Sequence, residues 1–177
     1  MSGKMKEIGK ERPKLYLMCG VVASGKSYFA EKHMDEEKDV YISRDQVRFE
    51  MVPETAEYFS REKEVYEEWI KRIAWALNAG FNVWADATHL NKKSRSKTFH
   101  ALTKKGIDFA SIEVTALVMD TPFLVCMERN SKRSGRYKVS ASAMRNMVNS
   151  FHKPDEEEKW INTIYIIHYQ KGGINNG

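Results

Sequence analysis

The sequence KLYLMCGVVASGKS, residues 14–27, decides the fold. Its first part is an apolar run typical of a buried strand, and Gly20–Ser27 satisfies the pattern G-x-x-x-x-G-K-[ST]. A helix is expected directly after it, over residues 26–33. This strand–loop–helix order is the context that a phosphate-binding loop requires, so it favours nucleotide binding over a chance match of a short pattern.

The loop predicts the cofactors ATP and Mg²⁺. Its backbone N–H groups can surround the β-phosphate, and the helix N-terminus adds a partial positive charge. Lys26 can bridge the β- and γ-phosphates, and the Ser27 hydroxyl can be a ligand of Mg²⁺. The nucleotide-binding residues expected here are Gly20, Val21, Val22, Ala23, Ser24, Gly25, Lys26, Ser27 and Tyr28.

Strands and helices alternate along the rest of the chain, which predicts an α/β fold with a parallel sheet covered by helices. Strands are expected at residues 14–19, 40–43, 81–85, 112–119 and 161–168, and helices at 26–33, 60–78 and 92–105. A short helix should start within residues 40–48, another after Thr121 with Pro122 at its first position, and another after Ser140. We expect one domain, residues 14–170, between tails at 1–13 and 171–177.

Composition is that of an ordinary globular protein, because 42% of the 177 residues are hydrophobic and 30% are charged. Apolar stretches are far shorter than the roughly 20 residues of a membrane-spanning helix. The N-terminal segment lacks the apolar run of a secretory signal, which predicts a cytoplasmic protein. Cys19 and Cys126 stand within apolar runs and are expected to be small, reduced core residues.

The net charge is +5, and the charges are segregated. Residues 87–107 and residues 129–153 contain many lysines and arginines and no acidic residue. This pattern indicates a polyanionic ligand, whether nucleotide phosphates, nucleic acid or both. Solvated helix faces explain the same pattern equally well.

A carboxylate and a guanidinium follow the second predicted strand, in VYISRDQVR, residues 40–48. Asp45 and Arg48 are three residues apart, so they share one face of a helix. Asp45 could accept the proton of an attacking hydroxyl while Arg48 binds a phosphate of the same substrate. The structural alternative is a capping box formed by Ser43 and Gln46, with Asp45 placed favourably near the helix N-terminus.

The third strand also ends near an acidic residue, Asp86. Such a carboxylate can hold a water of the Mg²⁺ shell, although a turn aspartate that caps the loop fits as well. His89 is expected to be structural. Lys92, Lys93 and Arg95 give the next helix a basic first turn, which is the wrong sign for a helix N-terminus and suggests a nearby anion.

A basic cluster, RNSKRSGR, occupies residues 129–136. It runs from the end of a predicted helix into a Ser-Gly loop, and arginines on such a segment can close over a triphosphate. Complementing a helix C-terminus explains one or two of these charges but not the whole cluster. The sequence therefore predicts an arginine-rich lid.

Together, GVVASGKS, ISRDQVR, DATHLN and RNSKRSGR resemble the 5′-kinase domain of bacteriophage-type polynucleotide kinases, within the AAA-like group of P-loop kinases. The resemblance covers residues 14–151. It implies a P-loop kinase fold whose five parallel strands have the order 2-3-1-4-5. It also implies transfer of the ATP γ-phosphoryl group to a 5′-hydroxyl of RNA or DNA, the chemistry of nucleic acid repair.

Carried over position by position, the resemblance implies a role for each matching residue. Asp45 would be the general base, and Arg48 would contact the 3′-phosphate of the acceptor. Asp86 and Thr88 would lie in the acceptor pocket, with Asp86 and Ser27 serving Mg²⁺. Arg129 would contact the nucleotide. The catalytic set would be Asp45, Lys26 and Arg133, the last reaching the phosphates from the lid.

Two departures from the family pattern stand out. Val22-Ala23 replaces the Pro-Gly often found in this loop, and no D-x-D phosphatase motif is present, so the chain would be a kinase alone. Two other functions stay open. A small-molecule kinase, acting on a nucleoside, sugar or antibiotic hydroxyl, predicts a closed acceptor pocket. A nucleotide-binding regulator predicts that Asp45 and the lid arginines do not converge.

Overall fold

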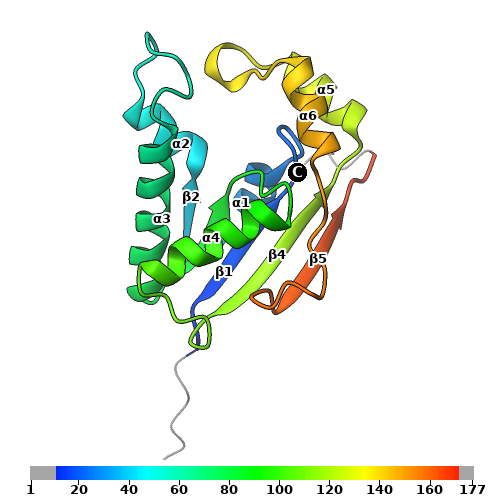
Figure 1. The fold of residues 1–177 in the computed structure, drawn as a ribbon. Coiled ribbons are helices and arrows are strands. Elements are labelled where there is room, and N and C mark those ends of the chain that lie inside the picture. The colour runs from blue at the N-terminus through cyan, green and yellow to red at the C-terminus, as the bar shows by residue number, and fades with distance from the viewer. Residues whose placement is uncertain (1–10, 172–177) are drawn as a thin grey trace, which may run out of the picture.

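The computed structural model describes residues 11–171, which form a five-stranded parallel sheet with helices on both faces (Figure 1). The strands are β1 (Lys14–Cys19), β2 (Asp39–Ser43), β3 (Asn82–Asp86), β4 (Glu113–Asp120) and β5 (Thr163–His168). Their order is β2-β3-β1-β4-β5, and every neighbouring pair is parallel. The α/β class and the order 2-3-1-4-5 are therefore confirmed. Because all strands run the same way, their carboxyl ends share one edge of the sheet.

The helices follow the predicted order. They are α1 (Lys26–His33), α2 (Arg44–Met51), α3 (Glu62–Asn78), α4 (Lys92–Lys104), α5 (Phe123–Ser131) and α6 (Ala141–Asn149), with a 3₁₀ turn η1 (Gly135–Tyr137) between the last two. Bounds that differ from expectation do so by one or two residues. Pro122 is the N-cap of α5 rather than its first residue, and its carbonyl accepts from the N–H groups of Val125 and Cys126. Within residues 11–171, none of the helices combines the length and apolarity needed to cross a membrane.

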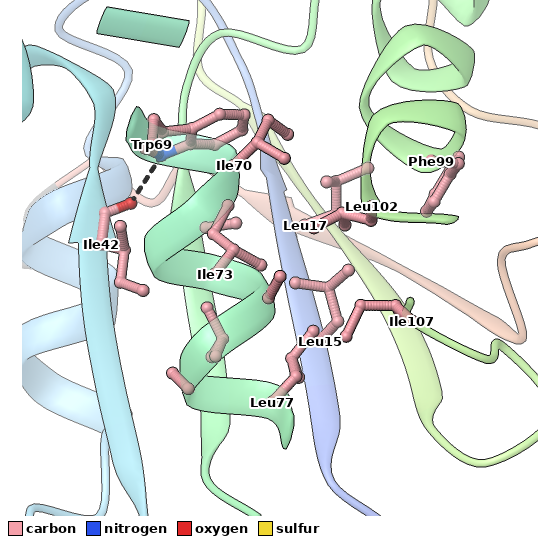
Figure 2. Close-up of a cluster of buried hydrophobic side chains, with 14 of the residues drawn as sticks. Leu15, Leu17, Ile42, Trp69, Ile70, Ile73, Leu77, Phe99, Leu102 and Ile107 are labelled. Carbon is pink, nitrogen blue, oxygen red and sulfur yellow. Dashed lines mark hydrogen bonds between the residues drawn. The ribbon is translucent and has the colours of Figure 1, made fainter. Parts of the chain in front are cut away.

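The largest core cluster lies between the sheet and the helices α3 and α4 (Figure 2). Side chains of β1 alternate, so Leu15 and Leu17 join this cluster while Met18 joins a smaller one on the opposite face, against α1. Trp69 of α3 is fully buried and donates its indole N–H to the Ile42 carbonyl at 3.1 Å (Figure 2). This bond ties α3 to the edge strand β2.

Both cysteines are buried and unpaired, as expected for small core residues. Burial raises the pKa of the Cys19 thiol to about 12. The thiol of Cys19 is therefore protonated and unreactive at neutral pH.

The basic first turn of α4 has a partner within the chain. Arg95 is almost completely buried and binds both carboxylate oxygens of Glu158, with Nε to Oε2 at 2.8 Å and Nη2 to Oε1 at 2.5 Å. Its Nη1 also donates to the carbonyls of His89 and His152. The anion suggested by this turn is thus a glutamate of the protein itself, and the ion pair fastens the segment before β5 onto α4.

Candidate functional site

The phosphate-binding loop connects β1 to α1 at the carboxyl edge of the sheet. Gly25 is the N-cap of α1 and has a left-handed backbone with φ 100°, and Ala23 has φ 62°. Gly20 is required for space, because a Cβ there would lie 2.6 Å from Ser24 Oγ. Left-handed residues of this kind turn successive N–H groups toward a common centre, which suits a phosphate.

Neighbouring elements hold this loop in place. Thr121 Oγ1 donates to the Ser24 carbonyl at 2.8 Å, and the Gly20 N–H donates to the Thr88 carbonyl at 3.0 Å. Lys26 Nζ donates to the carbonyls of Gly20 and Val21 at 3.0 and 3.1 Å. The ammonium group of Lys26 therefore lies over the phosphate-binding loop, of which Lys26 is itself a part.

Asp45 lies in the first turn of α2, directly after β2. Arg48 and Tyr58 both donate to its Oδ1, the tyrosine at 3.2 Å. None of the described residues donates to Oδ2, and the side chain is 60% exposed. Ser43 accepts from the N–H of Gln46, which is the N-cap half of the predicted capping box, and among the described residues the return bond from the Gln46 side chain is absent. The cap and an available carboxylate therefore coexist in one turn.

Arg48 is only 5% exposed, because Glu62 of α3 holds it from the other side. Its Nε and Nη2 donate to Glu62 Oε2 at 3.2 and 2.8 Å. Glu62 also accepts from Arg44. The guanidinium thus bridges two carboxylates, and this network fixes the position of Asp45.

Asp86 is the last residue of β3, level with Met18 of β1 and Ser43 of β2. Tyr41 donates its hydroxyl to Asp86 Oδ2. Burial, and then the charge of Asp86, raise the pKa of Tyr41 well above its ordinary value. The phenol therefore keeps its proton and orients this carboxylate.

The lid predicted over residues 129–136 begins at the end of α5. Arg129 Nη1 donates to the Ala23 carbonyl of the phosphate-binding loop at 3.3 Å. Asn130 is buried and forms two bonds with Val139, donating to its carbonyl at 2.7 Å and accepting from its N–H at 3.0 Å. These bonds close the base of the segment that carries Arg133.

One cleft of about 1620 Å³ unites these groups. The predicted site residues that line it are Val22, Ala23, Ser24, Gly25, Lys26, Ser27, Tyr28, Asp45, Arg48, Asp86, Thr88, Arg129 and Arg133. Gly20 and Val21 lie outside its lining. The other ionic groups on its walls are Arg44, Arg136, Lys138, Glu54 and Glu62. Arginines and lysines thus outnumber carboxylates, and the basic segment 129–153 contributes to the cleft, whereas the basic helix α4 does not.

His89 is structural, as its sequence context suggested. It is buried with φ 43°, and its Nδ1 lies 2.7 Å from the Met18 carbonyl. Burial is the main reason that its pKa falls to about 4, so the imidazole is neutral. It secures the turn after β3 against the end of β1.

The cleft fits a nucleotide with Mg²⁺. Among the described residues, the buried Ser24 Oγ of the loop lacks a hydrogen-bond partner, which a phosphate oxygen can supply. Residues 11–171 contain no cluster of three metal-ligating side chains, so Ser27 and Asp86 need further oxygens to complete a cation site. Phosphate and water oxygens are the ligands that Mg²⁺ usually keeps beside one or two carboxylates.

Four residues of this site escaped the sequence analysis: Tyr41, Tyr58, Glu62 and Asn130. Tyr41, Tyr58 and Glu62 act through residues that the motifs had marked, namely Asp86, Asp45 and Arg48. Asn130 acts instead through the backbone groups of Val139. Glu62, for example, is 14 residues from Arg48. Only its position at the start of an amphipathic helix, facing the carboxyl edge of the sheet, could have singled it out.

Comparison with known proteins supports the fold described above. The family model AAA_33, described as an AAA domain, matches residues 15–154. A search of curated proteins found no match. Many solved structures share the fold.

Three of these structures show the range of proteins that share the fold. A chain of the Pnkp1/Rnl/Hen1 RNA repair complex has a TM-score of 0.65 and 23% identity over 84% of this chain and 46% of its own. A fungal RNA kinase has a TM-score of 0.65 and 11% identity over 92% and 76%. The APS kinase CysC of Mycobacterium tuberculosis, in complex with AMPPNP and APS, has a TM-score of 0.58 and 18% identity over 88% and 89%.

At these identities the three structures establish the P-loop kinase fold alone. The chain spans less than half of the length of the RNA repair protein.

Proposed function

Since this chain belongs to the AAA_33 family of AAA domains, and the match includes every candidate site residue, we propose that it is an ATP-dependent kinase acting on polynucleotides. It transfers the γ-phosphoryl group of ATP to a 5′-hydroxyl of RNA or DNA. The observation that carries this proposal is the shared cleft, in which the Asp45 carboxylate and the phosphate-binding loop line the same space.

Each residue has a role in the proposed reaction. Asp45 accepts the proton of the 5′-hydroxyl. At the same time the hydroxyl oxygen bonds to the γ-phosphorus, and the bond from that phosphorus to the ADP oxygen breaks. Lys26 and Arg133 stabilise the negative charge on the transferring group. Ser27 and Asp86 would hold Mg²⁺, which would neutralise phosphate charge.

The walls of the cleft support a polyanionic acceptor. Pockets for small molecules usually measure about 300–1,000 Å³. The volume of about 1620 Å³ leaves room beyond ATP for the end of a strand. Arg136 and Lys138 add positive charge to the wall, and Arg136 reaches the end of α2, where it donates to the Val52 carbonyl. The backbone of a strand would pass these basic groups.

A direct transfer assay tests the identity of the acceptor. The protein is incubated with γ-labelled ATP, Mg²⁺ and one of three acceptors: a 5′-hydroxyl oligonucleotide, the same oligonucleotide already carrying a 5′-phosphate, and a panel of nucleosides, sugars and adenylyl sulfate. We expect label on the 5′-hydroxyl oligonucleotide only. Label on a small molecule would make the protein a small-molecule kinase. Release of inorganic phosphate alone, or no turnover, would favour a nucleotide-binding regulator.

A further inference from the structure

Four aromatic rings line the cleft beside Asp45, and we call them the aromatic rim: Phe49, Tyr58, Phe59 and Tyr137. They come from α2, from the loop between α2 and α3, and from η1 in the lid. The rings are in contact in series. The centroids of Tyr137 and Phe49 are 4.8 Å apart, and those of Tyr58 and Phe59 are 4.7 Å apart.

Two guanidinium groups lie among these rings. Arg136 of the lid lies 4.8 Å from the Phe49 centroid and donates to the Val52 carbonyl at 2.8 Å. Arg48 lies 4.8 Å from the Tyr58 centroid and 5.4 Å from that of Phe59. The rim thus combines flat apolar faces with positive charge, the composition that single-stranded nucleic acid prefers.

Packing explains only part of the rim. Phe49 and Tyr58 are partly buried between α2 and the lid, so they hold these segments together. Phe59 and Tyr137 are different, since they are 58% and 63% exposed. Two large apolar rings kept in water on the wall of one cleft indicate a surface for a ligand.

The rim also has a fixed position relative to the proposed chemistry. Tyr58 donates to Asp45 Oδ1 at 3.2 Å, and its ring lies between those of Phe49 and Phe59, so the inner part of the series touches the candidate base. Burial raises the pKa of Tyr58, and the nearby charge of Asp45 adds to this effect, which keeps the phenol as the donor. A strand whose 5′-oxygen reaches Asp45 would bring its first bases to Phe59 and Tyr137.

We propose that Phe59 and Tyr137 form a stacking subsite for the nucleobases at the 5′ end of the acceptor. This inference rests on the proposed function. Because every base has an aromatic face, the subsite would bind all four bases and add affinity without sequence preference. It would also favour a polynucleotide over a sugar, which has no aromatic face.

The test compares the wild-type protein on two 5′-hydroxyl oligonucleotides, one normal and one with abasic sites at its 5′ end. At saturating ATP, kcat/KM should fall about tenfold or more on the abasic strand. Phe59→Leu combined with Tyr137→Leu should lower kcat/KM by a similar factor on the normal strand and change it little on the abasic strand. KM for ATP should stay within about twofold. Tyr165→Leu is the matched control, because Tyr165 is 57% exposed on β5 outside the cleft.

Three results would overturn the subsite while leaving the kinase proposal intact: equal kcat/KM for the wild-type protein on both strands, equal losses by the double variant on both, or a rise confined to KM for ATP. The first of these needs no variant, so it stands even if a substitution impairs folding. A wild-type protein that phosphorylates no polynucleotide at all would instead remove the proposed function, and the subsite with it.

Discussion

Single residues in this cleft divide into those that the reaction needs and those that position them. Asp45 is exposed, whereas its neighbour Arg48 is buried between Asp45 and Glu62. The resemblance assigned Arg48 to the acceptor phosphate, and that role stays a prediction. The geometry gives Arg48 a second role, that of positioning Asp45, because three of its N–H groups already donate to carboxylates of the protein.

Arg133 offers a direct test of the lid at the residue scale. We expect Arg133→Ala to lower kcat by about 10³-fold, since an arginine supplied to the transferring phosphoryl group contributes at least that much. The Kd for ATP should change far less, because Lys26 and the loop backbone remain. Lys132→Ala is the control, since Lys132 pairs with Glu128 and does not line the cleft. If the Arg133 variant had the same kcat as the control, Arg133 would have only a structural role.

The buried His89 predicts a pH dependence of stability. Its pKa is about 4 in the folded protein and about 6.5 when unfolded, so the unfolded chain binds the proton more readily. The stability that neutral His89 contributes is therefore fully present above pH 6.5 and is lost as the pH falls toward 4. Between pH 8 and pH 5 the free energy of unfolding should drop by about 2 kcal/mol.

Urea denaturation at several pH values measures this drop, and His89→Gln should show a flatter profile over the same range. Asp and Glu side chains titrate mainly below this window, so they do not mask the effect. An identical slope in the variant would show that another group takes up the proton.

At the scale of the elements, the sequence was informative where a motif is local. The loop between β1 and α1, the capped turn of α2 and the place of the basic segment 129–136 at the end of α5 were each predictable, because their residues follow one another and local spacing decides their geometry. Glu62 and Asn130 were not predictable. One depends on the packing of α3 against α2, and the other on the return of the chain at Val139.

The basic first turn of α4 illustrates the same limit. Its charges indicated an anion correctly, but sequence alone could not show that Glu158 supplies it from 63 residues away. Long-range pairing of this kind depends on how the segment before β5 packs on α4, so no local sequence pattern predicts it.

The lid gives a prediction at this scale. Asn130→Asp removes the N–H donor to the Val139 carbonyl and brings two oxygens together in a buried place, which costs about 1–3 kcal/mol. The segment between them should open more often, so trypsin should cleave faster after Lys132, Arg133 and Arg136. Asn146→Asp, on an exposed position of α6, is the control. Equal cleavage rates would mean that the clamp does not hold the lid.

Across the whole molecule, the sheet brings distant segments to one edge. The phosphate-binding loop after β1, Asp86 at the end of β3 and Asp45 after β2 share this edge because the strand order places β1, β3 and β2 side by side. The order itself came from the family resemblance, since alternation of strands and helices predicts a parallel sheet but not its sequence of strands. The cleft is thus a consequence of topology, and α2, α3 and the lid only complete its walls.

The most direct measurement is single-turnover phosphorylation of a 5′-hydroxyl oligonucleotide by Asp45→Asn, alongside ATP binding by the same variant. Asparagine keeps the shape of the side chain but cannot take the proton, so the rate should fall by about 10²–10⁴-fold while the Kd for ATP is unchanged. Glu57→Gln, a nearby exposed change outside the cleft lining, should keep the full rate. Phosphoryl transfer by Asp45→Asn at the wild-type rate would contradict the account.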